Sequence, residues 1–264
     1  MKLTTLICTL LISSLTAIGT AQAQEKKLRI GTEAGYAPFE YKNAQGEIVG
    51  FDVDVANAIC EKLQATCEWI DQPFDSLIPG LQARKFDIIH AGITRSEARE
   101  RVITFSADLY AIPTQLIAKK DSGLLPSIDS LKGKRVGVLQ GSTQEAYARK
   151  AWSKEGVTIV SYQEQEQTYG DLQANRLDAV LAEKPNAIAG FLSKTEGKAY
   201  DFVGEPISND TLVENHIAMG MRKADKQLKA DVDEAIMQLR KEGVIEKLSK
   251  DYFQEGEIGL FKAE

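Results

Sequence analysis

The sequence predicts an α/β protein built of two lobes that two crossing strands connect. Apolar segments of strand length alternate with segments of helical spacing, and this alternation occurs twice along the chain. A polar break at Asp121-Ser122-Gly123 separates the two series. A β-α-β-α-β order predicts a mainly parallel sheet with right-handed crossovers in each lobe.

The first series predicts three strands and two helices. Leu28–Thr32 is a short apolar strand, and the apolar residues of Phe51–Leu63 recur at helical spacing. Cys67–Ile70 is the second strand, Leu77–Leu81 a short helix and Phe86–Ala91 the third strand. The second series repeats this alternation; its predicted strands are Arg135–Leu139, Val157–Ser161 and Asp178–Ala182, and its predicted helices are Thr143–Trp152, Tyr169–Leu177 and Pro185–Ser193.

Two extended segments connect the series. Leu109–Lys119, with Pro113 inside it, leads from the first lobe to the second, and Ile217–Met221 is the strand that returns. Two amphipathic helices follow, near Ala224–Leu239 and Val244–Phe253, and we expect no strand after them. This order places lobe 1 at 24–111 and 214–264 and lobe 2 at 112–213. The cleft between them faces the carboxyl ends of both sheets, where small ligands bind in such folds.

The amino end has the pattern of an export signal. Lys2 precedes the apolar run Leu3–Ile18, and Ala21-Gln22-Ala23 is a small-x-small cleavage site. A transmembrane anchor is the alternative, but the run is short for a span of ~20 residues. We expect residues 1–23 to be removed after Ala23 and the mature chain to be soluble and periplasmic.

Charge and cysteines narrow the function further. The net charge is −6 and no basic run occurs, which disfavours nucleic acid as a partner. Cys60 and Cys67 are an even pair in an exported chain, which favours a disulfide over two buried thiols. A zinc site is disfavoured, because the two histidines, His90 and His216, lie far from this pair in sequence.

The loop after the first strand carries a carboxylate, Glu33, and an aromatic ring, Tyr36. A carboxylate beside an aromatic face is one way to hold a cation. Phe74, in a loop after Pro73, is a second aromatic candidate, although it could equally pack the lobe. This combination predicts a cationic ligand.

A second group of residues suits an anion. Ser96 can cap a short helix that carries Arg99, whose guanidinium can form two parallel hydrogen bonds with a carboxylate. The alternative is a solvated arginine, which is the interpretation for Arg95 and Arg101. The turn Gln140–Gln144 opens a helix whose N–H groups attract an anion, or it is an ordinary helix cap.

Glu183 follows the strand Asp178–Ala182 and could bind an ammonium group from there. The alternative is a carboxylate that stabilises the helix start before Pro185. Enzyme signatures are sparse: the chain has no Gly-x-Ser-x-Gly elbow, and His90, in or beside a buried strand, is interpreted as a core or cleft-edge histidine.

Together these residues resemble the polar amino-acid-binding proteins of bacterial ABC importers, a periplasmic solute-binding family. The resemblance covers Lys27 to Phe253 and is strongest to the lysine/arginine/ornithine and histidine binders. Its motifs are Gly31-Thr32-Glu33, Tyr36-Ala37-Pro38-Phe39, Gly50-Phe51-Asp52-Val53-Asp54, Phe74-Asp75-Ser76-Leu77-Ile78-Pro79, Leu131-Lys132-Gly133-Lys134 and Gly137–Glu145. It implies the two-lobed type II periplasmic binding protein fold.

The resemblance also implies a role for each site residue. Arg99 would bind the ligand α-carboxylate with the N–H groups of Thr94 and Thr143, and Glu183 would bind the α-ammonium with the Gly92 carbonyl and the Thr94 hydroxyl. The rest of the expected set is Tyr36 and Phe74 around the aliphatic side chain, Glu33 at a terminal cation, and Ala91 and Gln144.

Three positions depart from the family pattern. Glu183 stands where an Asp is usual, Ala91 and Gly92 stand where Ser is frequent, and Leu212–His216 replaces a Tyr/Phe-Phe-Gly pattern before the returning strand. The expected function is capture of a basic amino acid and delivery to an ABC permease, by a monomer without cofactor or metal. The alternatives are a cyclohexadienyl-dehydratase-like enzyme with Glu183 as general acid, and a ligand sensor for a membrane receptor.

Overall fold

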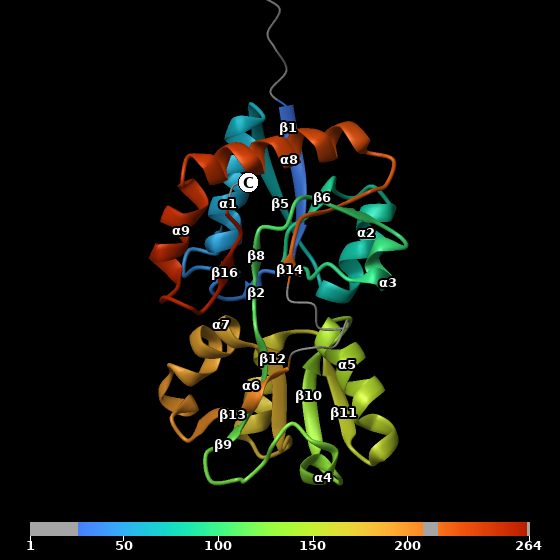
Figure 1. Ribbon diagram of the computed structural model, residues 1–264, viewed down its shortest axis with the longest axis vertical. Helices are drawn as coiled ribbons and strands as arrows, with labels where there is room; N and C mark the ends of the chain where they lie inside the picture. Colours follow the sequence, from blue (N-terminus) through green and yellow to red (C-terminus); the bar gives the residue numbers. More distant parts are fainter. Residues whose placement is uncertain (1–25, 208–215, 263–264) are drawn as a thin grey trace, which may run out of the picture.

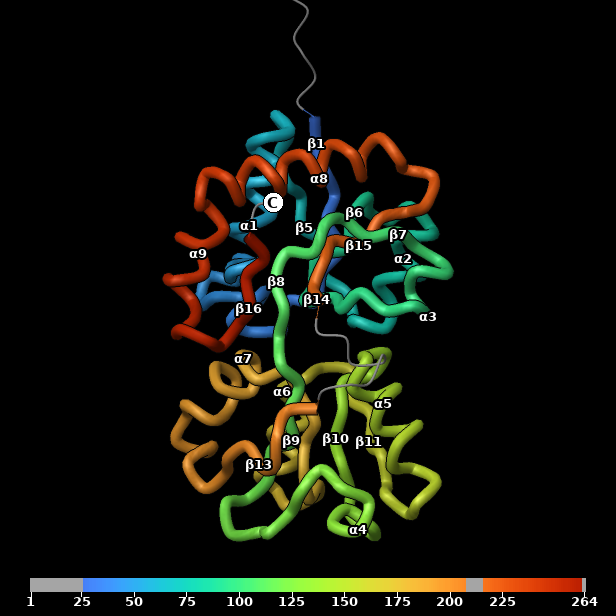
Figure 2. Tube along the Cα trace, viewed as in Figure 1, coloured from blue at the N-terminus to red at the C-terminus, as the bar shows by residue number. Residues whose placement is uncertain are grey.

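The computed structural model describes residues 26–207 and 216–262, so the predicted signal at 1–23 lies outside the described residues. Two lobes are stacked along the long axis of the molecule, and each is built around its own five-stranded sheet (Figure 1). The first described strand begins at the end of lobe 1 remote from lobe 2, and the chain passes through lobe 2 before it returns (Figure 2).

The sheet of lobe 1 has the strand order β5-β1-β6-β15-β7. β1 pairs in parallel with β5 and β6, whereas β15 is antiparallel to β6 and β7. The strands are β1 (Lys26–Thr32), β5 (Ala65–Asp71), β6 (Ile88–Ile89), β7 (Thr104–Phe105) and β15 (Gly220–Met221); the helices are α1 (Phe51–Lys62), α2 (Leu77–Gln82), α3 (Glu97–Glu100), α8 (Lys226–Lys241) and α9 (Val244–Tyr252), with the 3₁₀ turn η1 (Phe74–Ser76).

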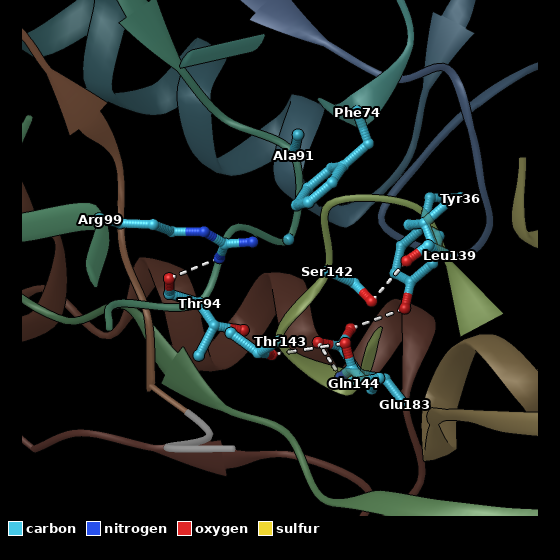
Figure 3. Close-up of a pocket in the computed structure, with 11 residues that line it drawn as sticks. Tyr36, Phe74, Ala91, Thr94, Arg99, Leu139, Ser142, Thr143, Gln144 and Glu183 are labelled. Atoms are coloured by element: carbon cyan, nitrogen blue, oxygen red, sulfur yellow. Dashed lines mark hydrogen bonds between the residues drawn. The ribbon is translucent and has the colours of Figure 1, made fainter. Parts of the chain in front are cut away.

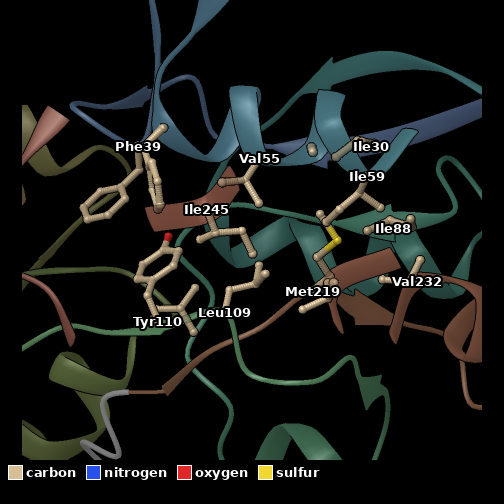
Figure 4. Packing of buried hydrophobic residues seen from close by; sticks show 14 of the residues in the cluster. Ile30, Phe39, Val55, Ile59, Ile88, Leu109, Tyr110, Met219, Val232 and Ile245 are labelled. Atoms are coloured by element: carbon tan, nitrogen blue, oxygen red, sulfur yellow. The ribbon is translucent and has the colours of Figure 1, made fainter. Parts of the chain in front are cut away.

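The core of lobe 1 lies between this sheet and the helices α1, α8 and α9. Val55 and Ile59 of α1 point into it beside Ile30 and Ile88 of the sheet (Figure 4). Cys60, at the end of α1, forms a disulfide with Cys67 of β5, so the predicted bridge is confirmed.

The sheet of lobe 2 has the strand order β11-β10-β12-β9-β13. β10 is parallel to β11 and β12, and β9 is antiparallel to β12 and β13. The strands are β9 (Thr114–Lys119), β10 (Arg135–Leu139), β11 (Thr158–Tyr162), β12 (Ala179–Glu183) and β13 (Tyr200–Ile207); the helices are α4 (Ile128–Leu131), α5 (Thr143–Ala151), α6 (Gln165–Gln173) and α7 (Lys184–Ala187), with the short turns η2 (Ser153–Glu155), η3 (Ile188–Leu192) and η4 (Thr195–Gly197).

The structure corrects several predicted boundaries. The helix predicted at Tyr169–Leu177 is α6, which begins four residues earlier and ends at Gln173, before Asn175 takes a left-handed φ of 56°. The helix predicted at Pro185–Ser193 is the short α7 followed by the π-turn η3. β13 was not predicted; it adds a second antiparallel pair to a sheet that the antiparallel β9–β12 pair already makes mixed.

The predicted crossing segment Leu109–Lys119 divides at Pro113 into β8 (Tyr110–Ala111) and β9. β8 pairs with the returning strand β14 (His216–Ile217) on one side and with β16 (Gly259–Leu260) on the other. The expectation that no strand follows the last helices is therefore wrong, because β16 follows α9 and closes this small sheet. In the segment Leu212–His216, which departs from the family pattern, the residues Leu212–Asn215 lie outside the described residues.

A second small sheet, β2 (Gly35–Tyr36), β3 (Glu40–Lys42) and β4 (Ile48–Val49), precedes α1 and faces lobe 2. Gly50 connects this sheet to α1 with a φ of 135°, and a Cβ there would lie 2.3 Å from the Phe39 carbonyl oxygen, so only glycine fits. Among the described residues, none of the helices is both long and apolar enough to cross a membrane.

Candidate functional site

A small pocket lies between the lobes, where the first strand-end loops of lobe 1 meet α5 and β12 of lobe 2 (Figure 3). Its volume is about 10 Å³, which is room for about one water molecule. Nine of the ten predicted ligand-binding residues line it. The lining residues are Tyr36, Phe74, Ala91, Gly92, Thr94, Arg99, Leu139, Ser142, Thr143, Gln144 and Glu183.

Arg99 is the buried cation of the pocket. Ser96 caps α3, as predicted, and its hydroxyl accepts from the Arg99 N–H at 3.4 Å. The guanidinium donates to the Thr94 carbonyl at 2.7 Å and, across the cleft, to the Gly141 carbonyl at 3.0 Å. Burial lowers the pKa of Arg99 to about 10, so it stays charged at neutral pH. Arg101, by contrast, is 72% exposed in its ion pair.

Phe74 supports this cation from lobe 1. Its ring, in η1, lies 5.3 Å from the guanidinium carbon of Arg99, which is a cation–π distance. Phe74 is half-buried; it packs against the core of lobe 1 and also lines the pocket, so both interpretations of the sequence apply to it. The ring and the two hydrogen bonds fix the orientation of the guanidinium, so its remaining N–H groups are held ready to donate to a ligand.

Glu183 is the buried anion, at the end of β12. Its carboxylate accepts from the Tyr36 hydroxyl at 2.9 Å and from the Gln144 amide at 3.4 Å. Burial raises its pKa to about 7, although the hydrogen bonds from Tyr36 and Gln144 act in the opposite direction. Glu183 is also the N-cap residue of α7, in line with the alternative interpretation, but its side chain makes no capping hydrogen bond and is bonded to Tyr36 and Gln144 instead.

The turn between β10 and α5 brings backbone N–H groups to the pocket. Ser142 is the N-cap of α5, with its hydroxyl accepting from the Glu145 N–H at 3.0 Å, and Thr143 opens the helix. The first N–H groups of a helix have no partner inside it, so they can donate to an anion. Ser142 and Leu139 were not predicted as ligand-binding residues; Ser142 lies in the predicted turn Gln140–Gln144, and Leu139 ends the strand before it.

Gly92 has a φ of +53° and lines the pocket between the lobes. A Cβ at Gly92 would lie 3.6 Å from the Tyr36 ring and 3.9 Å from a Glu183 carboxylate oxygen. These are ordinary contact distances, so a serine at this position would be disfavoured by the left-handed φ and not by lack of space for its Cβ.

Glu33 is placed differently from the other nine residues. It lines an adjoining, more open cleft of about 710 Å³ instead of the central pocket. Glu33 is only 5% exposed, and burial together with the negative charges of Glu164 and Asp71 raises its pKa to about 8. The charged residues around this cleft are Glu33, Asp71, Glu164 and Glu166 against Lys42 and Lys194, so its lining is net negative.

The two histidines do not contribute to the pocket. His90 is fully buried behind it, and burial lowers the pKa of its imidazole. His216 lies at the surface with its Nδ1 3.0 Å from Asp108. Within the part of the chain that the structure describes, no cluster of His, Cys, Asp or Glu could hold a metal ion.

Comparison with known proteins agrees with this architecture. Residues 28–255 match the model of "Bacterial extracellular solute-binding proteins, family 3". The chain is 43% identical to the lysine/arginine/ornithine-binding periplasmic protein of Escherichia coli K12, over 96% of this chain and 97% of the relative. It is 42% identical to the histidine-binding periplasmic protein of Salmonella typhimurium LT2, with the same coverage.

A solved structure, an ancestral arginine-binding protein bound to arginine, superimposes with a TM-score of 0.81 at 32% identity, covering 87% of this chain and 99% of that one. The two-lobed type II fold predicted from the sequence is thereby confirmed. The match of the family model to most of the chain identifies this protein as a member of the bacterial extracellular solute-binding proteins, family 3.

Proposed function

We propose that this protein captures a free amino acid, with cationic side chains preferred, between its lobes and delivers it to the permease of an ABC transporter. The observation that carries the proposal is the buried guanidinium of Arg99 and the buried carboxyl group of Glu183, one from each lobe of a single pocket. An amino-acid zwitterion presents the complementary pair. The relatives named above bind lysine, arginine, ornithine or histidine, which supports the same class.

Each constant group of the ligand has a partner in this site. The α-carboxylate would accept from the Arg99 guanidinium and from the N–H groups at Thr94 and Thr143, and the α-ammonium would donate to Glu183 and to the Gly92 carbonyl. In the structure two of these groups bond to residues of the opposite lobe: the Arg99 guanidinium donates to the Gly141 carbonyl, and Glu183 accepts from the Tyr36 hydroxyl. A pocket of about 10 Å³ cannot admit an amino acid, so the lobes must separate for the ligand to enter.

The side chain of the ligand would point towards Glu33. That carboxylate lies in the net negative cleft next to the pocket, with Glu164 contributed by the opposite lobe. A cation there would be attracted to Glu33 and would favour its ionised form. A neutral side chain would leave the like charges of both lobes uncompensated, which supports a basic ligand.

Lobe movement would centre on the crossing strands. We place the lobe boundaries at 111/112 and 213/214, the first of them between β8 and Pro113. We further propose that the protein acts as a monomer without cofactor, in the periplasm, after removal of residues 1–23. The family comprises solute-binding proteins, so an enzymatic role is not proposed; a receptor-sensing role would use the same pocket.

Calorimetry with L-arginine and L-citrulline tests the proposal, because citrulline has nearly the shape of arginine without its charge. Wild-type protein is expected to bind arginine at least tenfold more tightly than citrulline. Glu33→Gln is expected to reduce this ratio towards one, whereas Glu61→Gln, on an exposed face of α1, leaves it unchanged. If wild-type protein binds no amino acid of a twenty-member set plus ornithine, the proposed function is wrong.

A further inference from the structure

A fully buried carboxylate, Asp52, lies directly behind the pocket and takes no part in the ligand contacts described above. It stands in the first turn of α1 and is 0% exposed. One of its oxygens accepts from the Gly92 N–H at 3.1 Å. The other accepts from the Tyr110 hydroxyl at 2.5 Å. A buried carboxylate is retained only where such partners offset its lost hydration.

One of these partners, Gly92, belongs to the pocket, and the other, Tyr110, belongs to a strand that connects the lobes. Gly92 is a pocket residue whose left-handed conformation directs its carbonyl, and Tyr110 belongs to β8, the strand through which the chain leaves lobe 1. The Tyr110 ring is also stacked on Phe39 at 5.6 Å, and Phe39 in turn lies 6.0 Å from Tyr36 (Figure 4 shows Phe39 and Tyr110). Tyr36 bonds to Glu183 of the opposite lobe.

The loop after Gly92 is attached to the returning strand as well. Thr94 forms a bridge with Ile217, and the Arg95 N–H donates to the His216 carbonyl at 2.8 Å. Ile217 pairs with Tyr110 in the neighbouring strand. The pocket loop and both crossing strands are therefore hydrogen-bonded side by side, and Asp52 joins the first residue of the loop to the outgoing strand.

Two further ionisable side chains, His90 and Glu40, lie beside Asp52, and Glu40 also forms a side-chain hydrogen bond with it. His90 Nδ1 lies 3.4 Å from the carboxylate, and burial lowers the pKa of this imidazole, which disfavours a compensating charge. Glu40 is fully buried on the adjoining strand β3, and burial, together with the charge of Asp52, raises its pKa well above the usual range.

We propose that Asp52 is a positioning residue of the amino-acid site, which holds the Gly92 peptide in its binding orientation and couples it to the hinge strand through Tyr110. The inference rests on the proposed function, because it assigns the Gly92 carbonyl to the ligand ammonium. It predicts that Asp52 affects all amino-acid ligands equally, since the ammonium group is common to them.

The chain supplies a matched control. Asp54, two residues further along α1, accepts from the Tyr252 hydroxyl at 2.5 Å and does not contact the pocket. The two Asp–Tyr pairs share residue types, helix and bond length, but only the first reaches a pocket residue. Asp52→Ala is expected to weaken binding of both arginine and citrulline about 10- to 100-fold, the effect of a lost hydrogen bond to a charged group. Asp54→Ala is expected to stay within twofold of wild type.

Conservative variants separate positioning from simple stabilisation. Asp52→Asn keeps an oxygen that can accept from Gly92 and an amide that can donate to Tyr110, so affinity should return to within about fivefold of wild type. Tyr110→Phe, which removes only the hydroxyl, should weaken arginine binding about 3- to 10-fold, whereas Tyr252→Phe should not.

Calorimetry on the folded fraction of each variant decides the question. Equal affinities for Asp52→Ala and Asp54→Ala would overturn the proposal, as would an Asp52→Ala effect on arginine alone. If Asp52→Ala does not fold, the Tyr110→Phe and Tyr252→Phe pair carries the test, and equal affinities there overturn it. Failure of the proposed function is distinguishable, because it appears as absence of binding in the wild type.

Discussion

The two lobes build their halves of the pocket in different ways. Lobe 2 presents Thr143 and Glu183 directly at the ends of β10 and β12, where the chain turns from strand to helix. Lobe 1 presents its residues on a two-residue strand, a 3₁₀ turn, a loop and a one-turn helix. The half in lobe 2 follows from local strand–turn–helix rules, whereas the half in lobe 1 depends on partners far away in sequence, such as Asp52 and Gly92.

We expect the strongest single contact with the ligand to be that of Arg99, from lobe 1, with the α-carboxylate. Replacing Arg99 is the most severe test of this expectation. Arg99→Ala should weaken binding of every amino acid about a thousandfold or more, because two charge-assisted hydrogen bonds to the ligand carboxylate are lost. The measurement is calorimetry, with Arg101→Ala from the same segment as the control. An affinity of Arg99→Ala within about tenfold of wild type would show that another group holds the carboxylate.

The two lobes can also be compared through their buried carboxylates, Glu33 in lobe 1 and Glu183 in lobe 2. With the lobes in contact, their pKa values rise from 4.5 to about 8 and about 7. Because both pKa values are raised by contact between the lobes, the protonated carboxyl groups favour that contact at low pH. This stabilisation is lost as the pH rises through about 7 for Glu183 and about 8 for Glu33.

Without amino acid, small-angle X-ray scattering should therefore show a smaller radius of gyration at pH 5 than at pH 8.5. Glu183→Gln and Glu33→Gln should each reduce this difference, because a neutral amide imposes no such dependence. A radius that does not change with pH in the wild type would contradict the sign. Arginine at pH 8.5 should restore the compact form, because its positively charged groups offset the negative charges of the two ionised carboxylates.

Among the described residues only lobe 1 contains a disulfide, so removing it tests how much the bridge stabilises this lobe. Removing the bridge with the double substitution Cys60→Ala and Cys67→Ala should lower the free energy of unfolding by about 2 kcal/mol, as expected for a loop with a sequence separation of 7. Urea unfolding measures this. Arginine affinity should remain within about twofold, because the bridge lies at the end of α1 remote from the pocket residues.

The smallest effect is expected at the exposed contact between the lobes. The Gln140 amide donates to Asp75 at 2.7 Å across the cleft, and both side chains are open to solvent. Gln140→Ala should change arginine affinity by less than about twofold, because exposed hydrogen bonds contribute little. The same assay applied to Asn186→Ala, which removes a partly buried bond to the Ala37 carbonyl, should give the larger loss of the two.

The sequence predicted elements with a local pattern better than elements that exist only through pairing with distant strands. The strand β10 and the cap at Ser142 follow from a local pattern, and both were recognisable. β13 was missed because Gly204 and Pro206 interrupt its apolar alternation, and only its pairing with β9 makes it a strand. β16 is two residues long and exists through its pairing with β8.

Side-chain placement was predictable where an element fixes it. Arg99 and Glu183 were identified because a cap and a strand end position them. The half-buried state of Phe74 was not, since it depends on the Arg99 guanidinium above its ring. The sequence likewise contains no sign that Asp52 contacts Gly92, because the two residues are 40 positions apart.

The pairing of β16 with β8 has a practical consequence for sensors made from this protein. A fluorescent protein or affinity tag fused at the carboxyl end would be tethered beside the strand that links the lobes. Such a fusion would hinder the movement of the lobes that the sensor is meant to report. A label joined ahead of β1, at the end of lobe 1 opposite lobe 2, would leave that joint unburdened (Figure 1).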